Sequence, residues 1–172
     1  MNSKFDNYRP FLKATETLEN CNLTNLTSFD LPENAKIISS ILATSDPWLT
    51  LHISKNAIEN YISNDDSNLY KYLIKIEDEI SGIICIRNPW LIGPYIELFG
   101  LKPECRNLGI GREIINWIEL ETRHKYKNLW VTTSSFNIKA LNFYKKQGFY
   151  KIGVIDELLS SSYDEILLRK RL

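Results

Sequence analysis

The sequence predicts one α/β domain with a mixed sheet, and two observations lead to that fold class. The chain has 172 residues, of which 44% are hydrophobic, which suits one core and leaves too little for a second full domain. Apolar residues alternate between strand spacing and helix spacing along the chain. The expected order of elements is β-α-α-β-β-β-α-β-α-β-β.

The first part of the chain, residues 1–22, lacks clear periodicity and is rich in polar side chains. We expect it to be an extension that is mobile or docks late, and residues 23–172 to form the single domain. Charged side chains interrupt the apolar stretch that a secretory signal needs, and no later segment approaches a membrane-spanning length. The expected location is therefore the cytoplasm, with no membrane partner.

Two helices are expected next. A capping box that starts at Asp30 predicts a helix over 30–43. A serine cap predicts a second helix over 54–63. Pro47 disfavours helix in the segment 46–52 between them, which we interpret as a lid.

Strand patterns occupy the middle of the chain. A β-hairpin is expected from strands at 70–76 and 80–86, joined by the charged residues 77–79. Asn, Pro and Gly residues bracket a loop over 88–94, and a third strand follows over 95–101.

The C-terminal part alternates helices and strands. Helical spacing from Gly109 onwards predicts a helix, and the next strand falls at 128–133. A second helix over 137–147 is expected to end at Gly148, because glycine favours the left-handed conformation that closes helices. The last two strands are expected at 150–155 and 165–169.

Charge and cysteine usage exclude several classes of partner. Lys plus Arg and Asp plus Glu each number 21, so no overall field attracts nucleic acid or an acidic membrane. Cys21, Cys85 and Cys105 form no C-x-x-C pair, so we expect neither a disulfide framework nor a metal site. His52 and His124 have no Ser or Cys partner in a recognisable pattern, which argues against a hydrolytic triad.

The most informative stretch joins a strand to a helix through a turn that contains Gly109 and Gly111. Glycines let the backbone approach a phosphate, and the unpaired N–H groups of a helix start face it. Arg106 and Arg112 can add charge. The stretch has neither the P-loop pattern nor G-x-G-x-x-G, so it indicates a different phosphate ligand; the alternative is an ordinary turn and cap.

Two motifs resemble those of the GCN5-related N-acetyltransferase (GNAT) superfamily. The spacing Arg106-x-x-Gly109-x-Gly111 is similar to the family's Q/R-x-x-G-x-G/A at a strand-to-helix junction. The resemblance covers about residues 23–170, and the expected order of elements agrees with it. The family's second motif, N-x-x-A-x-x-F/L-Y-x-x-x-G-F, is similar to the segment with Asn137, Ala140, Phe143, Tyr144, Gly148 and Phe149.

The resemblance implies a GNAT fold, with a mostly antiparallel sheet, helices on both faces and two strands that splay apart at a cofactor slot. It implies transfer of an acetyl group from acetyl-CoA to a primary amine by direct attack in a ternary complex, without a metal. The strand with Phe99 and Leu101 would pair with the pantetheine arm, and Asn137 would contact the cofactor. The pyrophosphate would lie on Arg106, Asn107, Leu108, Gly109, Ile110, Gly111 and Arg112.

The reaction needs a base and an acid. An alkyl ammonium has a pKa of about 10.4, so the acceptor must lose a proton before it attacks. We interpret Glu97, on the same expected strand face as Phe99 and Leu101, as the base; the alternative is a solvated carboxylate or the partner of a Lys or Arg. The resemblance assigns proton donation to the leaving thiolate to Tyr144; the alternative is a packing role for its ring.

Four residues of expected connecting segments are candidates for the acceptor pocket: Trp48, His52, Trp90 and Tyr163. Large aromatics there either line a pocket or cover core. We expect a small-molecule amine or a flexible peptide terminus as acceptor, and a monomer or homodimer. The rival functions are protein N-terminal or lysine acetylation, and acyl-CoA sensing without turnover.

Overall fold

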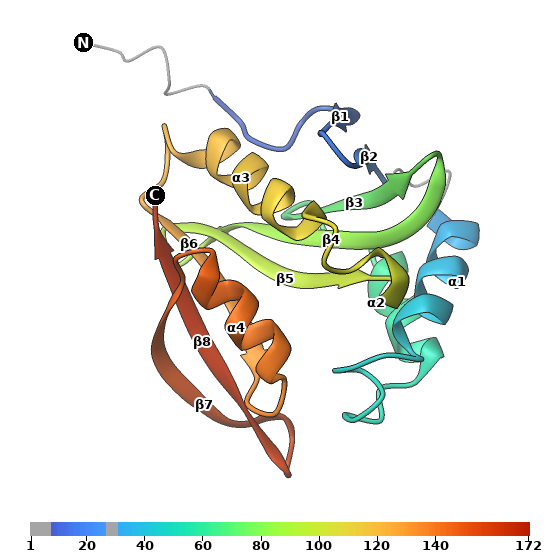
Figure 1. Cartoon of the computed structure of the whole chain (residues 1–172), viewed down its shortest axis with the longest axis vertical. Helices are drawn as coiled ribbons and strands as arrows, with labels where there is room; N and C mark the ends of the chain where they lie inside the picture. Colours follow the sequence, from blue (N-terminus) through green and yellow to red (C-terminus); the bar gives the residue numbers. More distant parts are fainter. Residues whose placement is uncertain (1–7, 27–30) are drawn as a thin grey trace.

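The computed structural model describes residues 8–26 and 31–172, and one sheet runs through them (Figure 1). Its eight strands lie in the order β1-β2-β3-β4-β5-β6-β8-β7, and only β5 and β6 are parallel neighbours. The predicted mixed, mostly antiparallel sheet is confirmed. The strands are β1 (Thr15–Thr17), β2 (Asn22–Asn25), β3 (Leu69–Ile76), β4 (Glu79–Trp90), β5 (Gly93–Leu101), β6 (Asn128–Ser134), β7 (Tyr150–Ser160) and β8 (Tyr163–Arg171).

Helices cover both faces of the sheet, as predicted. One hydrophobic cluster lies between the sheet and α3 and α4, and a second lies between β3, β4, α1 and α2. Amphipathic spacing explains these positions, since each helix turns one apolar stripe toward the sheet. The helices are α1 (Leu31–Leu42), α2 (Lys55–Ser63), the short 3-10 helix η1 (Pro103–Cys105), α3 (Ile110–Thr122) and α4 (Ile138–Lys146).

The caps explain several of these boundaries. The Ser54 hydroxyl accepts a hydrogen bond from Ala57 N at 3.2 Å, as expected for the start of α2. Gly148 adopts φ 85°, and Phe149 N donates to Tyr144 O at 3.0 Å, which closes α4. The expected capping box at Asp30 lies outside the described residues.

The N-terminal segment, described from residue 8, is docked on the domain. Phe11 is 1% exposed, and the Tyr72 hydroxyl donates to its carbonyl at 2.8 Å. The Tyr8 hydroxyl donates to Glu121 of α3 at 2.9 Å. The short strand β1, which the sequence analysis did not anticipate, pairs with β2.

The segment that the sequence predicted as a loop over 88–94 is a tight hairpin turn between β4 and β5. Trp90 pairs with Gly93 across it, and Leu91 and Ile92 adopt φ 39° and 60°. Two consecutive non-glycine residues with positive φ are uncommon, which is why the pattern of the sequence did not indicate this turn.

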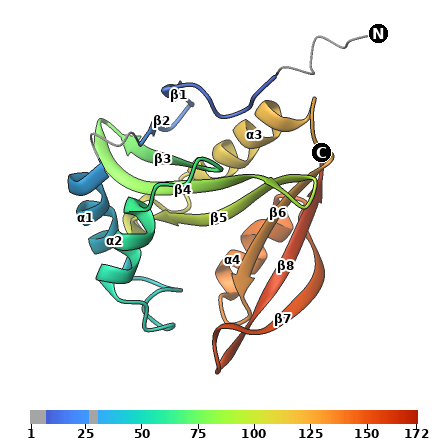
Figure 2. The same ribbon diagram turned by 180° about the vertical axis from the view of Figure 1, so that it is seen from behind.

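The two halves of the sheet differ in their cover. The second cluster, under α1 and α2, contains residues of β3, β4 and β5 but none of β6, β7 or β8 among the described residues. Figure 2 shows α2 in front of β4 and no helix over β7 and β8 on that side. We call this side the open face, defined by Trp130, Thr132 and Ser134 of β6 and by Glu165, Leu167 and Arg169 of β8.

Candidate functional site

The parallel strands β5 and β6 separate after a short contact. Only Tyr95 with Trp130 and Ile96 with Val131 are paired. β5 then continues to Leu101 and β6 to Ser134, so the facing edges of both strands beyond this contact are unpaired with each other. The result is a split in the sheet that opens toward the C-terminal ends of both strands, as the resemblance implied.

A β-bulge lies where the split begins. Two consecutive residues of β4 pair with Ile96 and Leu98, so Glu97 is the extra residue between them. Tyr61 of α2 contacts Glu97, whereas Phe99 packs in the cluster under α3 and α4. The expectation that Glu97 and Phe99 share a strand face is therefore wrong, because the bulge shifts the alternation of side chains by one residue.

The turn that follows β5 presents unpaired backbone donors. Asn107 and Gly109 both adopt left-handed conformations, with φ 65° and 88°. Within the described part of the chain, the backbone N–H groups of residues 107–111 have no hydrogen-bond acceptor. Successive free N–H groups at the start of a 13-residue helix are typical of an anion site, and we call residues 107–111 the phosphate turn.

The arginines of this turn play different parts. Arg106 Nε and Nη2 donate to Leu101 O at 3.1 and 3.0 Å, and Nη2 also donates to Ser45 Oγ at 3.1 Å. Its guanidinium therefore braces the turn against β5. Arg112 is exposed beside the free N–H groups and remains available for a phosphate.

Gly111 has a packing role in addition to its place in the turn. A Cβ atom there would lie 2.9 Å from Phe143 Cζ of α4, so only glycine lets the two helices approach this closely. Phe99 of β5 stacks edge-on against Phe143 with ring centroids 6.4 Å apart. By contrast, a Cβ atom at Gly109 would meet nothing closer than 3.8 Å, so the space in front of the turn is open there.

Tyr144 lies on α4 in the cluster beneath the split. Its ring packs edge-on against Phe143 and Phe149, with centroids 5.1 and 5.3 Å away. Burial raises the pKa of the Tyr144 hydroxyl, and the nearby Tyr95 hydroxyl raises this pKa further. The hydroxyl has no hydrogen-bond partner among the described residues, so it stays protonated and free to donate.

Asn137 caps the helix that carries Tyr144. Its Oδ1 accepts from Ala140 N at 3.1 Å, which accounts for this asparagine by helix capping. The cofactor contact that the resemblance implies would have to come from its amide nitrogen.

Glu97 is held in a network on the α2 side of the sheet. Arg87 donates to it from Nη2 at 2.9 Å and also from Nε, while the Tyr61 hydroxyl donates to it at 3.0 Å. Arg87 also pairs with Asp66 at 2.8 Å. Three donors therefore bind the Glu97 carboxylate, which matches the ion-pair alternative and not a free base.

Two of the acceptor candidates, Trp48 and His52, lie in the segment between α1 and α2. Their environments differ. Trp48 is 9% exposed and packs in the cluster under α1 and α2, where its ring lies against the backbone at Gly100. It is a core residue, contrary to the expectation of a pocket wall. His52 is exposed, with φ 53°.

The other two candidates lie on opposite sides of the strand contact. Trp90 stacks on Tyr95 with ring centroids 4.6 Å apart, next to the closed end of the split. Tyr163 begins β8 beyond the open end and packs on Phe136 at 4.5 Å. The structure thus does not assemble the four predicted residues into one pocket.

A polar row on the open face was missed by the sequence analysis. The Tyr95 hydroxyl bonds with Thr132 Oγ1 at 2.7 Å. Two residues along β6, the Ser134 hydroxyl donates to Glu165 of β8. Thr132 and Glu165 fall within expected strands, but the sequence does not indicate that these two strands are neighbours.

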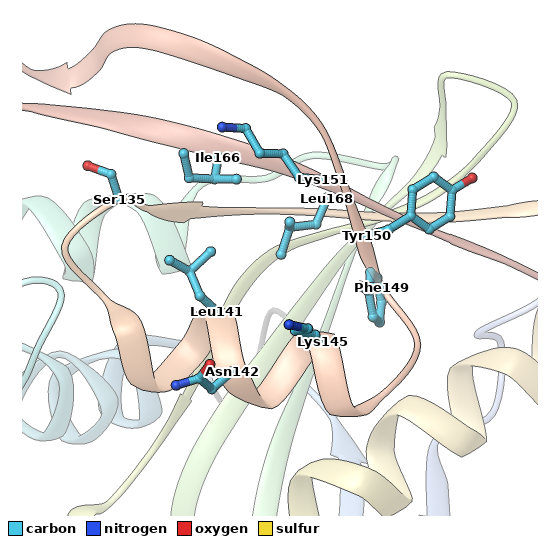
Figure 3. Close-up of a pocket in the computed structure, with 9 residues that line it drawn as sticks. All are labelled: Ser135, Leu141, Asn142, Lys145, Phe149, Tyr150, Lys151, Ile166 and Leu168. Atoms are coloured by element: carbon cyan, nitrogen blue, oxygen red, sulfur yellow. The ribbon is translucent and has the colours of Figure 1, made fainter.

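A separate pocket of about 450 Å³ lies between α4 and the β7–β8 hairpin (Figure 3). Leu141, Ile166 and Leu168 form its apolar part, with Lys145 and Lys151 nearby. It lies on a different side of α4 from Phe143, which contacts the phosphate turn, so it is not part of the split.

Neither a metal site nor a spanning helix is found in the described part of the chain. Among residues 8–26 and 31–172, no group of three or more His, Cys, Asp or Glu side chains is placed to hold a metal ion. None of the helices in the described part of the chain is long and apolar enough to cross a membrane.

Solved acetyltransferases share this fold. A GNAT family acetyltransferase from Elizabethkingia anophelis with acetyl-CoA bound is 23% identical, with a TM-score of 0.66 over 90% of this chain and 100% of that one. An acetyltransferase from Thermus thermophilus is 14% identical, with a TM-score of 0.69 over 91% and 100%. The ribosomal-protein-S18-alanine N-acetyltransferase from Escherichia coli is 18% identical, with a TM-score of 0.65 over 87% and 92%.

A search among curated proteins gives no match. The family model for the acetyltransferase (GNAT) family matches residues 22–149, which contain the split, the phosphate turn and α4. The chain therefore belongs to the GNAT family of acyl-CoA-dependent N-acetyltransferases.

Proposed function

We propose that the protein binds acetyl-CoA in the split between β5 and β6 and transfers the acetyl group to a primary amine by direct attack in a ternary complex. One observation carries this proposal. The split leads into a turn whose N–H groups at residues 107–111 are free. An elongated ligand with an anionic middle and an arm that can pair with a strand edge fits both features.

The residues present fit coenzyme A. The left-handed conformations of Asn107 and Gly109 are typical of turns that gather backbone N–H groups around an anion, and a pyrophosphate could accept hydrogen bonds from them. Arg112 is exposed beside this point and can add a charge-assisted hydrogen bond. The edge of β5 from residue 97 to 101 faces no strand and can pair with the amides of the pantetheine arm.

Acetyl-CoA supplies the activated acyl group, and the chain supplies binding, orientation and proton transfer. The residues 107–111 and the β5 edge would hold the donor with its reacting end toward the bulge, which would limit the motion that attack must overcome. The Tyr144 hydroxyl is protonated because burial raises its pKa, so it can donate to the sulfur as the thiolate leaves.

We propose that the acceptor is a small amine that enters from the open face. Aromatic side chains there, with Trp90 stacked on Tyr95 and Trp130 edge-on to Trp90 at 5.7 Å, can contact an alkyl stem. The rivals remain a protein N-terminus or lysine as acceptor, as in the Escherichia coli ribosomal-protein-S18-alanine N-acetyltransferase, and a sensor that binds without turnover.

Two measurements test the proposal. Calorimetric titration with acetyl-CoA reports binding, and release of free thiol against amines, amino acids and peptides reports turnover. We expect Gly109→Val to weaken acetyl-CoA binding by about 10- to 100-fold, because a hydrogen bond to a charged group contributes about 1.5–3 kcal/mol. Valine cannot adopt the φ of 88° at this position without strain.

The matched control is Gly153→Val on β7, where a Cβ atom would meet nothing within 4 Å. We expect it to leave acetyl-CoA binding unchanged. Equal binding by the wild type and Gly109→Val would disprove the proposed pyrophosphate site, and binding without thiol release for any acceptor would favour the sensor.

A further inference from the structure

A buried carboxyl group lies on the open face close to the split. Glu165 of β8 is 3% exposed and pairs with Ser134 of β6 in the sheet. The Ser134 hydroxyl donates to its Oε1. Ile166 and Leu168, its neighbours on the opposite face of β8, pack toward α4.

Glu165 has no cationic partner. Among the described residues no Lys, Arg or His forms an ion pair with it. Arg169, on the same face of β8, donates to Asn128 at 2.8 Å and lies 5.5 Å from the ring of Trp130. The Oε2 of Glu165 has no donor among the described residues, yet it is not sealed from solvent, so it can receive a ligand.

The position of Glu165 relative to the split follows from the strand register. Val131 is the last β6 residue that pairs with β5, and Ser134, opposite Glu165, lies on the open side of that pair. Thr132, which holds the Tyr95 hydroxyl, lies two residues from Ser134, or roughly 7 Å along the strand. Burial is the main cause of the raised pKa of Tyr95, and the charge of Glu165 also raises it slightly, in keeping with this proximity.

We propose that Glu165 is the acceptor-binding carboxylate, which pairs with the ammonium group of a cationic small amine and then takes its proton. This inference rests on the proposed acetyl transfer and assigns to Glu165 the role that Glu97 cannot fill while three donors hold it. It also defines the substrate class as amines that enter as cations. Trp90 and Tyr95 would contact the alkyl part of the acceptor.

The protons balance in this scheme. The ammonium gives one proton to Glu165, and the neutral amine forms the new C–N bond as the C–S bond of the thioester breaks. The sulfur keeps the electron pair and takes a proton from Tyr144, which regains one from the nitrogen of the new amide. Glu165 finally releases its proton to solvent, so the net products are the amide, the free thiol and one proton.

Burial suits Glu165 to both parts of this role. Desolvation raises the pKa of its carboxyl, while the Ser134 hydrogen bond lowers it. A base with a pKa nearer to the working pH takes a proton from an ammonium more readily than an ordinary carboxylate. An unpaired buried carboxylate is costly, and the incoming ammonium offsets that cost, which favours cationic over neutral acceptors.

The test uses Glu165→Gln, which keeps the shape of the side chain and an acceptor for the Ser134 hydroxyl. The probes are n-butylamine, 1,4-diaminobutane and glycinamide, with n-butanol as the neutral analogue. Binding is measured by calorimetry with the protein alone, and acetylation by thiol release. Glu157→Gln, an exposed position on β7, is the matched control.

We expect the wild type to bind at least one of these amines and not n-butanol, and Glu165→Gln to bind that amine at least about tenfold more weakly, as for loss of a charged hydrogen bond. The variant should bind acetyl-CoA as the wild type does. Equal amine binding by wild type and variant, or no amine binding by the wild type, overturns the inference. Failure of acetyl-CoA to bind the wild type instead overturns the proposed function.

Discussion

In the half of the sheet formed by β1–β5, helices cover both faces and the buried or half-buried charged side chains Lys71, Arg87 and Glu97 all have partners, whereas the half formed by β6–β8 has helix cover on one face. Arg87 is shared by Asp66 and Glu97, and Lys71 Nζ donates to the Ile62 carbonyl at 2.7 Å. On the open face, Glu165 has only a serine hydroxyl for a partner among the residues that the structure describes.

This difference suggests that the β1–β5 half mainly stabilises the fold and that the β6–β8 half is available for substrate binding. Saturated polar groups stabilise a structure but have little capacity left for a substrate, whereas an incompletely paired buried group is available for chemistry. Substitutions in the first half should therefore change stability, and those beside the split should change turnover or acceptor binding.

The largest effect is expected for Tyr144→Phe, beside the split. Loss of a proton donor should lower kcat by about 10²–10⁴-fold, while the retained ring should leave acetyl-CoA binding and the Tm almost unchanged. Steady-state kinetics and calorimetry check this. Tyr150→Phe on β7, which is 41% exposed, is the control. A kcat equal to that of the wild type would assign a packing role to Tyr144. It would also contradict the expected functional difference between the two halves of the sheet.

Trp48→Ala tests the stabilising half. Because Trp48 is a core residue, its truncation should lower the free energy of unfolding by about 3–5 kcal/mol. Urea denaturation measures the loss, with Trp90→Ala as the same substitution at a less buried position. We expect Trp48→Ala to leave the acceptor KM of the folded enzyme unchanged. A raised acceptor KM with wild-type stability would restore Trp48 as a pocket wall.

Glu97→Gln tests whether Glu97, unlike Glu165, affects stability rather than catalysis. Removing the charge that pairs with Arg87 should lower the free energy of unfolding by about 1–3 kcal/mol, because a half-buried guanidinium loses a partner. Denaturant titration beside Glu157→Gln tests this. The pH–rate profile should keep the shape seen for the wild type. Wild-type stability together with loss of the acidic limb of that profile would identify Glu97 as the base after all.

The smallest effect concerns pH and Glu165. Its folded-state pKa is raised above the unfolded value of about 4.3, so the folded protein binds a proton that the unfolded chain has released. The contribution of Glu165 to the free energy of unfolding is therefore complete below the unfolded-state pKa. It is lost as the pH rises through the folded-state pKa. Besides Tyr95 across the split, the other titratable groups on β7 and β8 are Tyr150, Lys151, Asp156, Glu157, Tyr163, Asp164, Arg169, Lys170 and Arg171.

We would measure calorimetric Tm values of the wild type and Glu165→Gln at about pH 5 and about pH 8. Because all other titratable groups are common to both proteins, the difference gives the pH-dependent contribution of Glu165 to stability. We expect the variant to gain stability relative to the wild type as pH rises. A difference in Tm that does not depend on pH would show that Glu165 titrates as an ordinary carboxylate in the fold.

Local features of the sequence were enough to predict most elements and the glycine turn before α3. Periodicity placed the helices and strands, Ser54 and Gly148 marked helix ends, and Gly109 and Gly111 indicated the turn before α3. Such features depend on residues within one or two turns of each other, so the sequence alone determines them.

The tertiary structure alone decided which side chains meet. The bulge at Glu97 depends on its pairing with β4, and its capture by Arg87 joins residues 10 apart. The pairing of Glu165 with Ser134 joins residues 31 apart through two strands. The free energy that holds such contacts comes from pairing and burial between distant segments, which no local pattern encodes, and it is this packing that leaves one carboxylate saturated and the other open to an acceptor.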